Sequence, residues 1–294
     1  MRYLSAFYTD IGTQKKSNQD SLLIQEANTA TGTTLLAVLC DGLGGLQKGE
    51  IASAEMIKAF SAWFQYQYPI LLNQRFTADG LRESWSKLVS ETHQKLTTYG
   101  KMHGLSLGTT VEAVLFYEKR YYVFHIGDCR VYKKEGILQQ ITKDQTYIQQ
   151  EMDYGRMTLE EAIKDPKRNM LLQCVGAGNY LAPDFIQGEL APEQGFLICS
   201  DGFRHVISTG EIAEGMRLPS SHHEDLMRKR LDGLTELCKQ RGEKDNITSI
   251  WIHRLGNIHR KFRIFCCMEP VEKRFWSTMK DSAARDSIRL RSRA

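Results

Sequence analysis

Five aspartates stand at places where a strand-like stretch of the sequence meets a turn. Asp41 directly follows the apolar run Leu35–Cys40 and precedes Gly42, and Asp201 stands between Phe196–Ser200 and another glycine. The remaining three are Asp20, Asp128 and Asp245. A carboxylate at the end of a rigid strand can be held in place for binding or catalysis. The alternative for each of them, taken alone, is a solvated turn residue.

Carboxylates that lie close together repel one another, and this repulsion raises their pKa values. Hard divalent cations relieve the repulsion, because Mg²⁺ and Mn²⁺ prefer the oxygen atoms of carboxylates, carbonyls and water. The seven cysteines are scattered, and no His and Cys residues stand at the spacing of a zinc site. If the aspartates cluster, the sequence therefore predicts a Mg²⁺ or Mn²⁺ site.

The element that positions Asp41 is a buried strand, Thr33–Cys40, because its apolar residues follow one another without alternation. After the glycine-rich turn, the spacing of apolar residues predicts a helix from Lys48 to about Phe64. Pro69 is expected to end this helical region, and a second helix is expected over Asp79–Tyr99.

The remainder of the chain is expected to be rich in strands. These are predicted at Tyr3–Tyr8, Ser21–Ala27, Thr109–Tyr117, Arg120–His125, Arg130–Lys134, Ile137–Ile141, Phe185–Leu190, Gly195–Ser200 and Asn246–His253. The strands between residues 109 and 141 read as an antiparallel meander, and the polar block Lys143–Met170 is expected to be a mostly helical surface excursion. A helix is predicted at His222–Arg241, and His259–Phe265 could add one more strand.

Composition places the chain among soluble globular proteins. Its 294 residues are 41% hydrophobic and 25% charged, and no apolar run approaches the length of a membrane span. No secretion signal is apparent, and an odd number of scattered cysteines favours a reducing cytoplasm. Cys40, Cys174 and Cys199 are expected to be buried free thiols.

The charge is distributed unevenly along the chain. From Arg254 onward there are 11 Lys and Arg against 4 Asp and Glu, so the end is basic while the body is slightly acidic. An acidic body argues against nucleic-acid binding. The basic end is expected to be a solvated tail, and docking on a kinase or an acidic surface is the alternative.

Six short motifs, each weak alone, follow one another along the body of the chain. They are Gly12–Asp20, Asp41–Gly45 with Gly49–Ser53, Gly108–Thr110, Gly127–Tyr132, Ser200–Gly202 and Asp245–Thr248. In this order, over Tyr3–His253, the chain resembles the metal-dependent Ser/Thr protein phosphatases of type 2C, the PPM family, and most of all their bacterial branch.

The resemblance implies an α+β fold, a four-layer α-β-β-α sandwich of two antiparallel sheets flanked by helices. It implies a phosphatase domain over residues 1–254, followed by a basic C-terminal tail over 255–294. In the family, two Mn²⁺ or Mg²⁺ ions activate a water that attacks phosphoserine or phosphothreonine of a protein. Phosphoproteins are thus the implied substrates, a Ser/Thr kinase is the implied opponent, and the oligomeric state stays open.

The resemblance also assigns roles to residues that match its motifs. Asp41 would bridge both ions, and the carbonyl of Gly42 would bind one of them. The other implied positions are Asp201 and Asp245 on the second ion, Asp20 acting through water, Asp128 at a weaker third site, and Lys15 gripping the phosphate.

The sequence departs from the family pattern at four positions. Lys15 replaces an arginine and lacks its bidentate fork, although the neighbouring Lys16 could share its role. Gln19 stands where an acid is common, and Leu43 stands where eukaryotic members have a histidine. His205 stands in place of an aspartate of the third site. Lys15, Gln19 and His205 motivate an alternative function, a pseudophosphatase or phosphoprotein-binding module. Arg130 and His125 are expected to be structural, with Arg130 paired to a buried carboxylate.

Overall fold

The computed structural model describes residues 2–43, 48–218, 223–255 and 264–267. The strands are β1 (Arg2–Asp10), β2 (Ser21–Thr29), β3 (Gly32–Cys40), β4 (Val111–Tyr117), β5 (Arg120–Ile126), β6 (Arg130–Glu135), β7 (Ile137–Gln140), β8 (Asp184–Glu189), β9 (Gly195–Cys199), β10 (Ile247–Leu255) and β11 (Ile264–Cys267). They form two antiparallel sheets, one ordered β1-β10-β9-β6-β7 and the other β11-β2-β3-β4-β5-β8.

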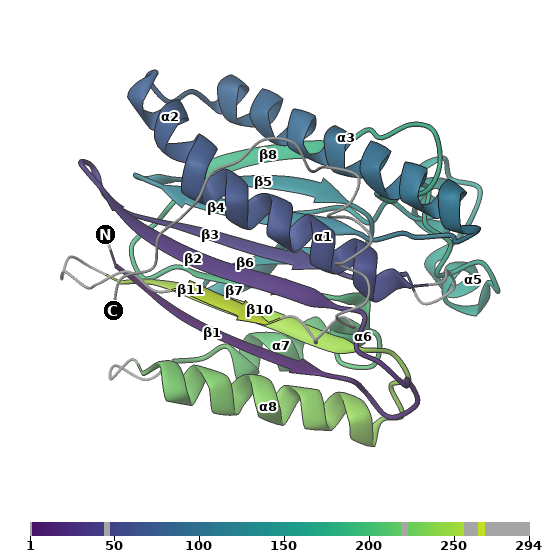
Figure 1. Cartoon of the computed structure of the whole chain (residues 1–294). Helices are drawn as coiled ribbons and strands as arrows, with labels where there is room; N and C mark the ends of the chain where they lie inside the picture. Colours follow the sequence, from purple (N-terminus) through teal and green to yellow (C-terminus); the bar gives the residue numbers. More distant parts are fainter. Residues whose placement is uncertain (1, 44–47, 219–222, 256–263, 268–294) are drawn as a thin grey trace, which may run out of the picture.

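Helices cover the outer faces of both sheets (Figure 1). The helices of the described residues are α1 (Gly49–Ala62), the π-helix η1 (Trp63–Gln67), α2 (Tyr68–Asn73), α3 (Ala78–His103), α4 (Tyr147–Asp153), α5 (Leu159–Lys164), α6 (Asp201–Arg204), α7 (Thr209–Gly215) and α8 (Glu224–Gln240). Helix α1 lies on β2 and β3, whereas α8 lies on β1 at the opposite side of the molecule (Figure 1). The expected α-β-β-α sandwich is confirmed.

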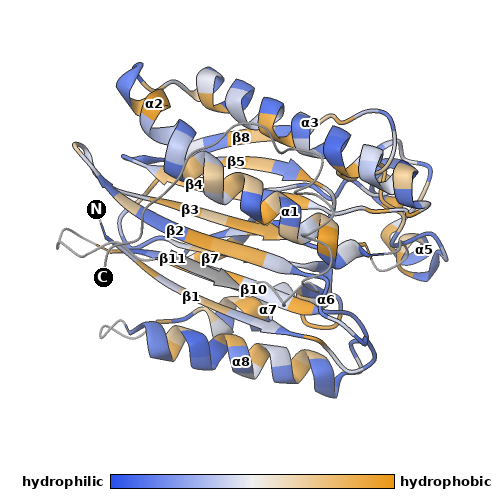
Figure 2. Ribbon diagram, in the orientation of Figure 1, coloured by the Kyte–Doolittle hydropathy of each residue, from blue (hydrophilic) through white to orange (hydrophobic). Residues whose placement is uncertain are grey.

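Strand β3 shows why the sheets stack in this way. Its side chains alternate between two cores, with Leu35, Ala37 and Leu39 packed in the layer between the sheets and Leu36 and Val38 packed under the helices. Both faces are thus buried, which explains the unbroken apolar run, and Figure 2 shows the central strands as mainly hydrophobic. A third core fills the space between the five-stranded sheet and α6 to α8, where Trp251 and Met227 are buried.

Two expectations about the helices are wrong. Pro69 does not end the first helical region, because it occupies the first turn of α2, where its missing N–H is not needed. The chain passes from α1 into α2 through η1, so three short helices replace one. In the excursion Lys143–Met170, only α4 and α5 are helical and the rest is turns and loops.

The C-terminal end is described only in part. Residues 264–267 form β11 and pair with β2, whereas 256–263 and 268–294, which carry most of the expected strand at 259–265 and the basic tail, lie outside the described residues. The boundary between residues 254 and 255 stays a prediction. None of the helices in the described part of the chain is both long and apolar enough to cross a membrane.

Candidate active site

The five aspartates gather at one edge of the sandwich, although they come from both sheets. Asp20 directly precedes β2, Asp41 directly follows β3, and Asp128 lies in the turn between β5 and β6. From the other sheet, Asp201 begins α6 immediately after β9, and Asp245 lies just before β10. Asp41 interacts electrostatically with all four of the others, so the structure brings the whole predicted set together.

The end of β3 is held in place by hydrogen bonds between its backbone and two other segments. The amide of Asp41 donates to Oγ1 of Thr110 at 2.9 Å, and the amide of Thr110 donates to the carbonyl of Asp41 at 2.9 Å. The next amide, that of Gly42, donates to the carbonyl of Gln19 at 3.1 Å. A Cβ at Gly42 would lie 2.5 Å from the carbonyl group of Gly49, so only glycine fits between these segments.

The peptide that carries Asp245 is pressed between two other glycines. Gly12, with a φ of 78°, comes from the loop after β1, and a Cβ there would lie 2.1 Å from the carbonyl oxygen of Asp245. Gly202, in α6, would place a Cβ 2.2 Å from the carbonyl oxygen of Asn246. The backbones of three segments that are remote in sequence are therefore in direct contact.

The side chain of Asn246 fastens two of these segments, its own and the loop after β1, by hydrogen bonds. Its Nδ2 donates to the carbonyls of Ile11 and Ser17 at 2.9 and 3.1 Å, and its Oδ1 accepts from the amide of Gln19 at 2.9 Å. The loop that carries Lys15 and Asp20 is thereby fixed to the segment that carries Asp245.

Burial makes the acids of the cluster unusual. Asp20 is 5% exposed, and in the described structure neither of its carboxylate oxygens has a hydrogen-bond partner with acceptable geometry. Its pKa rises to about 7 through burial and through repulsion from Asp201 and Asp245. Burial and the neighbouring carboxylates also raise the pKa of Asp41 well above its usual range. Oδ1 of Asp201 is a further buried oxygen without a partner among the described residues.

Asp128 is supported by an arginine that the sequence did not single out. Nη2 of Arg204 donates to the carbonyl of Asp128 at 2.9 Å and to Oδ2 of Asp144 at 3.1 Å. Burial and the charge of Asp201 raise the pKa of Asp128 to about 7, although Arg204 opposes the rise. Arg130 binds Asp144 through two hydrogen bonds of 2.7 and 2.8 Å, so the expected structural role of Arg130 is confirmed.

Lys15 lies at the acid cluster and contacts Asp245. Its Nζ is 2.6 Å from Oδ1 of Asp245, and its side chain is 29% exposed. Burial alone would lower the pKa of Lys15, but the hydrogen bond to Asp245 and the charges of Asp41 and Asp201 raise it. Lys15 is therefore a protonated cation with one face toward the acids and the other toward solvent.

His205 sits between two acids. Its Nε2 is 3.5 Å from Oδ2 of Asp201, and its Nδ1 is 3.5 Å from Oε2 of Glu243. Burial opposes the charge on the ring, yet these carboxylates raise the pKa of His205 above its ordinary value. A protonated imidazole has no free lone pair, so His205 suits an ion pair better than a metal ligand.

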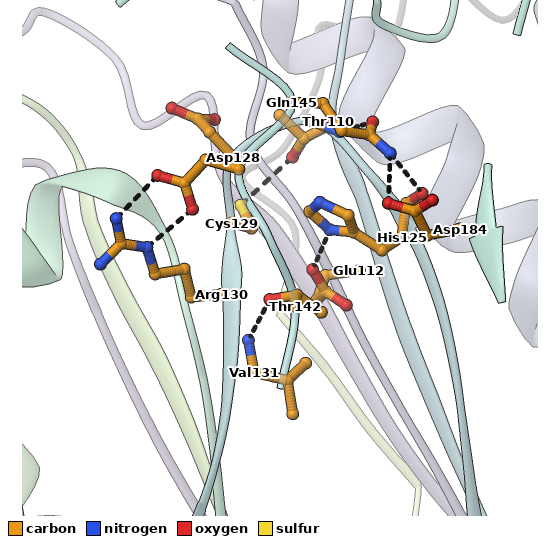
Figure 3. Close-up of polar contacts among 12 residues, drawn as sticks. Thr110, Glu112, His125, Asp128, Cys129, Arg130, Val131, Thr142, Gln145 and Asp184 are labelled. Carbon is orange, nitrogen blue, oxygen red and sulfur yellow. Dashed lines mark hydrogen bonds and ion pairs between the residues drawn. The ribbon is translucent and has the colours of Figure 1, made fainter. Parts of the chain in front are cut away.

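A second buried pair lies beneath the site, in the centre of the six-stranded sheet. Glu112 on β4 and His125 on β5 are fully buried, with Oε2 of Glu112 2.7 Å from Nδ1 of His125 (Figure 3). Nε2 of the same histidine lies 2.9 Å from the carbonyl of Lys143, which begins the excursion that carries α4 and α5. His125 is thus a satisfied core residue, as expected, and it also anchors this excursion to the sheet.

The oxygen donors of the acid cluster suit a divalent cation by their chemistry more than by their spacing. In the ranges that the structure describes, no three His, Cys, Asp or Glu side chains are grouped closely enough to hold one ion between them. The buried, partnerless oxygens of Asp20 and Asp201 and the mutual repulsion of the five carboxylates nevertheless call for positive charge. Oxygen donors of this kind fit Mg²⁺ or Mn²⁺ in chemistry.

A cleft of about 570 Å³ opens beside the acids. Asp128, Asp245 and Lys15 line it next to the acid cluster, and residues of the excursion that carries α4 and α5 line much of the rest. A cleft of this volume can hold a short segment of a peptide or a small organic molecule.

Comparison with known proteins shows what this chain is similar to. The family model described as protein phosphatase 2C matches residues 12–247. The chain belongs to the protein phosphatase 2C family. The Mycobacterium tuberculosis Ser/Thr protein phosphatase PstP is 31% identical over 251 residues, which cover 85% of this chain but only 44% of that relative. A putative 2C-type phosphatase of Streptococcus pyogenes is 31% identical over 83% of this chain and 95% of its own length.

Solved structures of the family agree with the fold. The S. agalactiae serine/threonine phosphatase has a TM-score of 0.74 at 26% identity, and the comparison covers 85% of this chain and 99% of that one. The catalytic domain of PstP in complex with two manganese ions has a TM-score of 0.68 at 28% identity, covering 86% and 98%. The resemblance inferred from the six motifs is therefore confirmed, and with it the fold.

Several residues of this protein phosphatase 2C site were missed from the sequence. Arg204 follows Phe203 in a short helix, and Asp144 lies in a loop. Their spacing in the sequence therefore gave no indication that they form an ion pair. Glu112 did carry a signal, because a lone acid inside the apolar strand β4 must find a buried partner.

Proposed function

We propose that this chain is a metal-dependent protein phosphatase that removes phosphate from Ser and Thr side chains. The observation that carries the proposal is the cluster of five carboxylates beside a cleft, with buried oxygens that lack a partner among the described residues, in a chain of the protein phosphatase 2C family. A structural relative in complex with two manganese ions supports the same chemistry.

Two Mn²⁺ or Mg²⁺ ions would be held by Asp41, the carbonyl of Gly42, Asp201 and Asp245. When bound, such ions lower the pKa of a water and neutralise charge that develops on the phosphate. Asp20 would act on them through water. We assign Asp128 to a weaker third site, whose affinity for a cation is reduced by the positive charge of Arg204 and the protonated His205 beside it.

Lys15 would bind the oxygens of the phosphate from the solvent side of the cluster. Its ammonium is already oriented by Asp245 at 2.6 Å, which keeps the flexible side chain over the acids. A single ammonium makes fewer directed hydrogen bonds than a guanidinium, so phosphate affinity is expected to be modest. Lys16 forms no ion pair with the described acids, whereas Lys15 does, so Lys15 alone carries this role in the proposal.

A covalent enzyme intermediate is not part of this proposal. The thiols nearest the acids, Cys40 and Cys129, are buried, and burial together with the neighbouring carboxylates raises their pKa values well above the ordinary range. A protonated, buried thiol is a poor nucleophile. Attack by water in line with the departing Ser or Thr oxygen needs no such group.

The decisive experiment replaces Asp201. We expect Asp201→Asn to lower Mn²⁺-dependent hydrolysis of a phosphopeptide and of p-nitrophenyl phosphate at least a hundredfold, since it removes several kcal/mol of stabilisation. Asp79→Asn is a matched control, because Asp79 is an exposed acid at the start of α3, and its turnover should stay within about twofold of wild type. Full activity of Asp201→Asn would refute the assignment.

A pseudophosphatase or phosphoprotein-binding module is the second candidate. Lys15, Gln19 and His205 depart from the family pattern, and the described acids are not gathered closely around one ion. The discriminating result is tight binding of a phosphopeptide without any turnover in Mn²⁺. If turnover is present, we propose that the enzyme opposes a Ser/Thr kinase in the cytoplasm, because only such a kinase supplies its substrates.

A further inference from the structure

The two sides of the cleft differ in chemistry. Opposite the acid cluster, α4 and α5 contribute a run of apolar side chains to the lining, which we call the apolar wall: Ile148, Met152, Leu159, Ala162 and Ile163. The lining thus combines charged groups on one side with aliphatic groups on the other. Binding of a phosphate alone would not require these aliphatic side chains.

Two residues of the apolar wall are exposed although their helix is well formed. Helix α5 begins with a capping box between Thr158 and Glu161, so its short length is stabilised locally. Leu159 and Ile163, four residues apart on one helical face, are nevertheless 66% and 60% exposed. Large aliphatic side chains left exposed beside a cleft mark a binding surface.

Two cations at the cleft complement an anionic ligand. Arg168 and Lys244 both line it, and within the described structure neither forms an ion pair with a carboxylate. The other cations of the lining are engaged, since Lys15 contacts Asp245 and Arg130 contacts Asp144. The cleft therefore suits a ligand that carries a phosphate and an aliphatic group together.

We propose that the apolar wall selects phosphoprotein segments that carry an aliphatic side chain directly next to the phosphorylated Ser or Thr. Successive side chains of an extended peptide point in opposite directions. When the phosphorylated side chain points to the acids, its neighbour points away from them, toward the rest of the lining, which includes Leu159 and Ile163. This inference deepens the proposed function and rests on it for the identity of the ligand.

The test uses binding, so that it does not depend on turnover. Short peptides with a non-hydrolysable phosphonate in place of the phosphoserine carry either Ile or Asn on both sides of it, and their Kd values are measured by fluorescence anisotropy in Mn²⁺. We expect the wild type to bind the Ile peptide about tenfold more tightly. Leu159→Gln and Ile163→Gln should each reduce this ratio.

Leu172→Gln provides the matched control. Leu172 is an exposed aliphatic residue, 45% exposed, that follows the same excursion but does not line the cleft. This variant should keep the tenfold ratio. Equal affinity of the wild type for both peptides, or an equal loss in Leu172→Gln and Leu159→Gln, would overturn the proposal. Absence of p-nitrophenyl phosphate hydrolysis would instead refute the proposed enzyme while leaving the measured preference intact.

Discussion

Two groups of buried acids lie close together in this protein and are stabilised in opposite ways. Glu112 is fully buried in the six-stranded sheet, and Oε2 of its carboxylate meets the imidazole of His125 at 2.7 Å (Figure 3). Asp20 is nearly as deeply buried, yet in the described structure neither of its oxygens has a partner with good hydrogen-bond geometry, and the charges around it are the carboxylates of Asp201 and Asp245. Burial raises the pKa of both carboxyl groups to about 7.

The presence or absence of a countercharge within the chain distinguishes a carboxylate that stabilises the fold from one that serves function. Where a buried acid serves the fold, the chain supplies the countercharge, as His125 does for Glu112 and Arg130 does for Asp144. Where no residue pairs with the acid, as at Asp20 in the described structure, the balancing charge must come from outside the chain. The following experiments test this contrast, beginning with the largest effect.

The largest expected effect follows from breaking the internal pair. Glu112→Ala should lower the free energy of unfolding by roughly 3–5 kcal/mol, because His125 is left buried without its countercharge. Denaturant unfolding in EDTA measures this loss. In a double-mutant cycle with His125→Ala, the combined loss should be clearly smaller than the sum, and additive losses would show that the pair is not coupled.

The acid cluster should behave in the opposite manner. In EDTA, Asp20→Asn should be at least as stable as the wild type, because it removes a buried carboxylate that its neighbours repel. In Mn²⁺ at a hundredfold excess over Kd, the wild type should gain roughly 3 kcal/mol, and the variant should gain less. Thermal unfolding with and without Mn²⁺ measures both. An equal gain in both proteins would exclude Asp20 from the cation site.

The smallest effect is a pH dependence that belongs to the internal pair. Burial opposes the charge on His125, but Glu112 and the carbonyl of Lys143 raise its pKa from 6.5 to about 9. Because the folded state holds this proton more tightly, the contribution to stability is complete below pH 6.5 and is lost as pH rises through 9. The expected loss is at most about 1.4 kcal/mol for each pH unit.

Urea unfolding in EDTA between pH 6.5 and 9 measures this dependence, and Glu112→Ala serves as the comparison. The variant lacks the main group that raises the pKa of His125, so its stability should fall less steeply over this range. Parallel curves for the two proteins would mean that His125 does not hold its proton through Glu112.

Local sequence patterns predicted the strands better than the helices. The run that ends in Asp41 was recognisable as a strand buried on both faces, since only such a strand lacks alternation. Pro69 was misinterpreted, because a proline that ends one helix and a proline that begins the next look alike in sequence. The pairing of strands into two sheets came from the family resemblance, because long-range register leaves no local signal.

The candidate site was predictable where its residues stand in motifs. Asp20, Asp41, Asp128, Asp201 and Asp245 were all found in this way, and the structure brings them to one edge. Arg204 was not found, because its value lies in two partners that are 60 and 76 residues away in sequence. The apolar wall was not found either, since Leu159 and Ile163 also suit an ordinary buried helix face. Only their exposure distinguishes them.

The contact of Gly12 and Gly202 with the peptide that carries Asp245 limits how this site can be rebuilt. A Cβ at either glycine would collide with a carbonyl oxygen of the segment that carries Asp245. The backbone conformations of the three segments therefore depend on one another. Grafting a single loop from a relative into this chain would leave mismatched backbones in contact. An engineer who wishes to alter the chemistry must transplant all three segments as one piece.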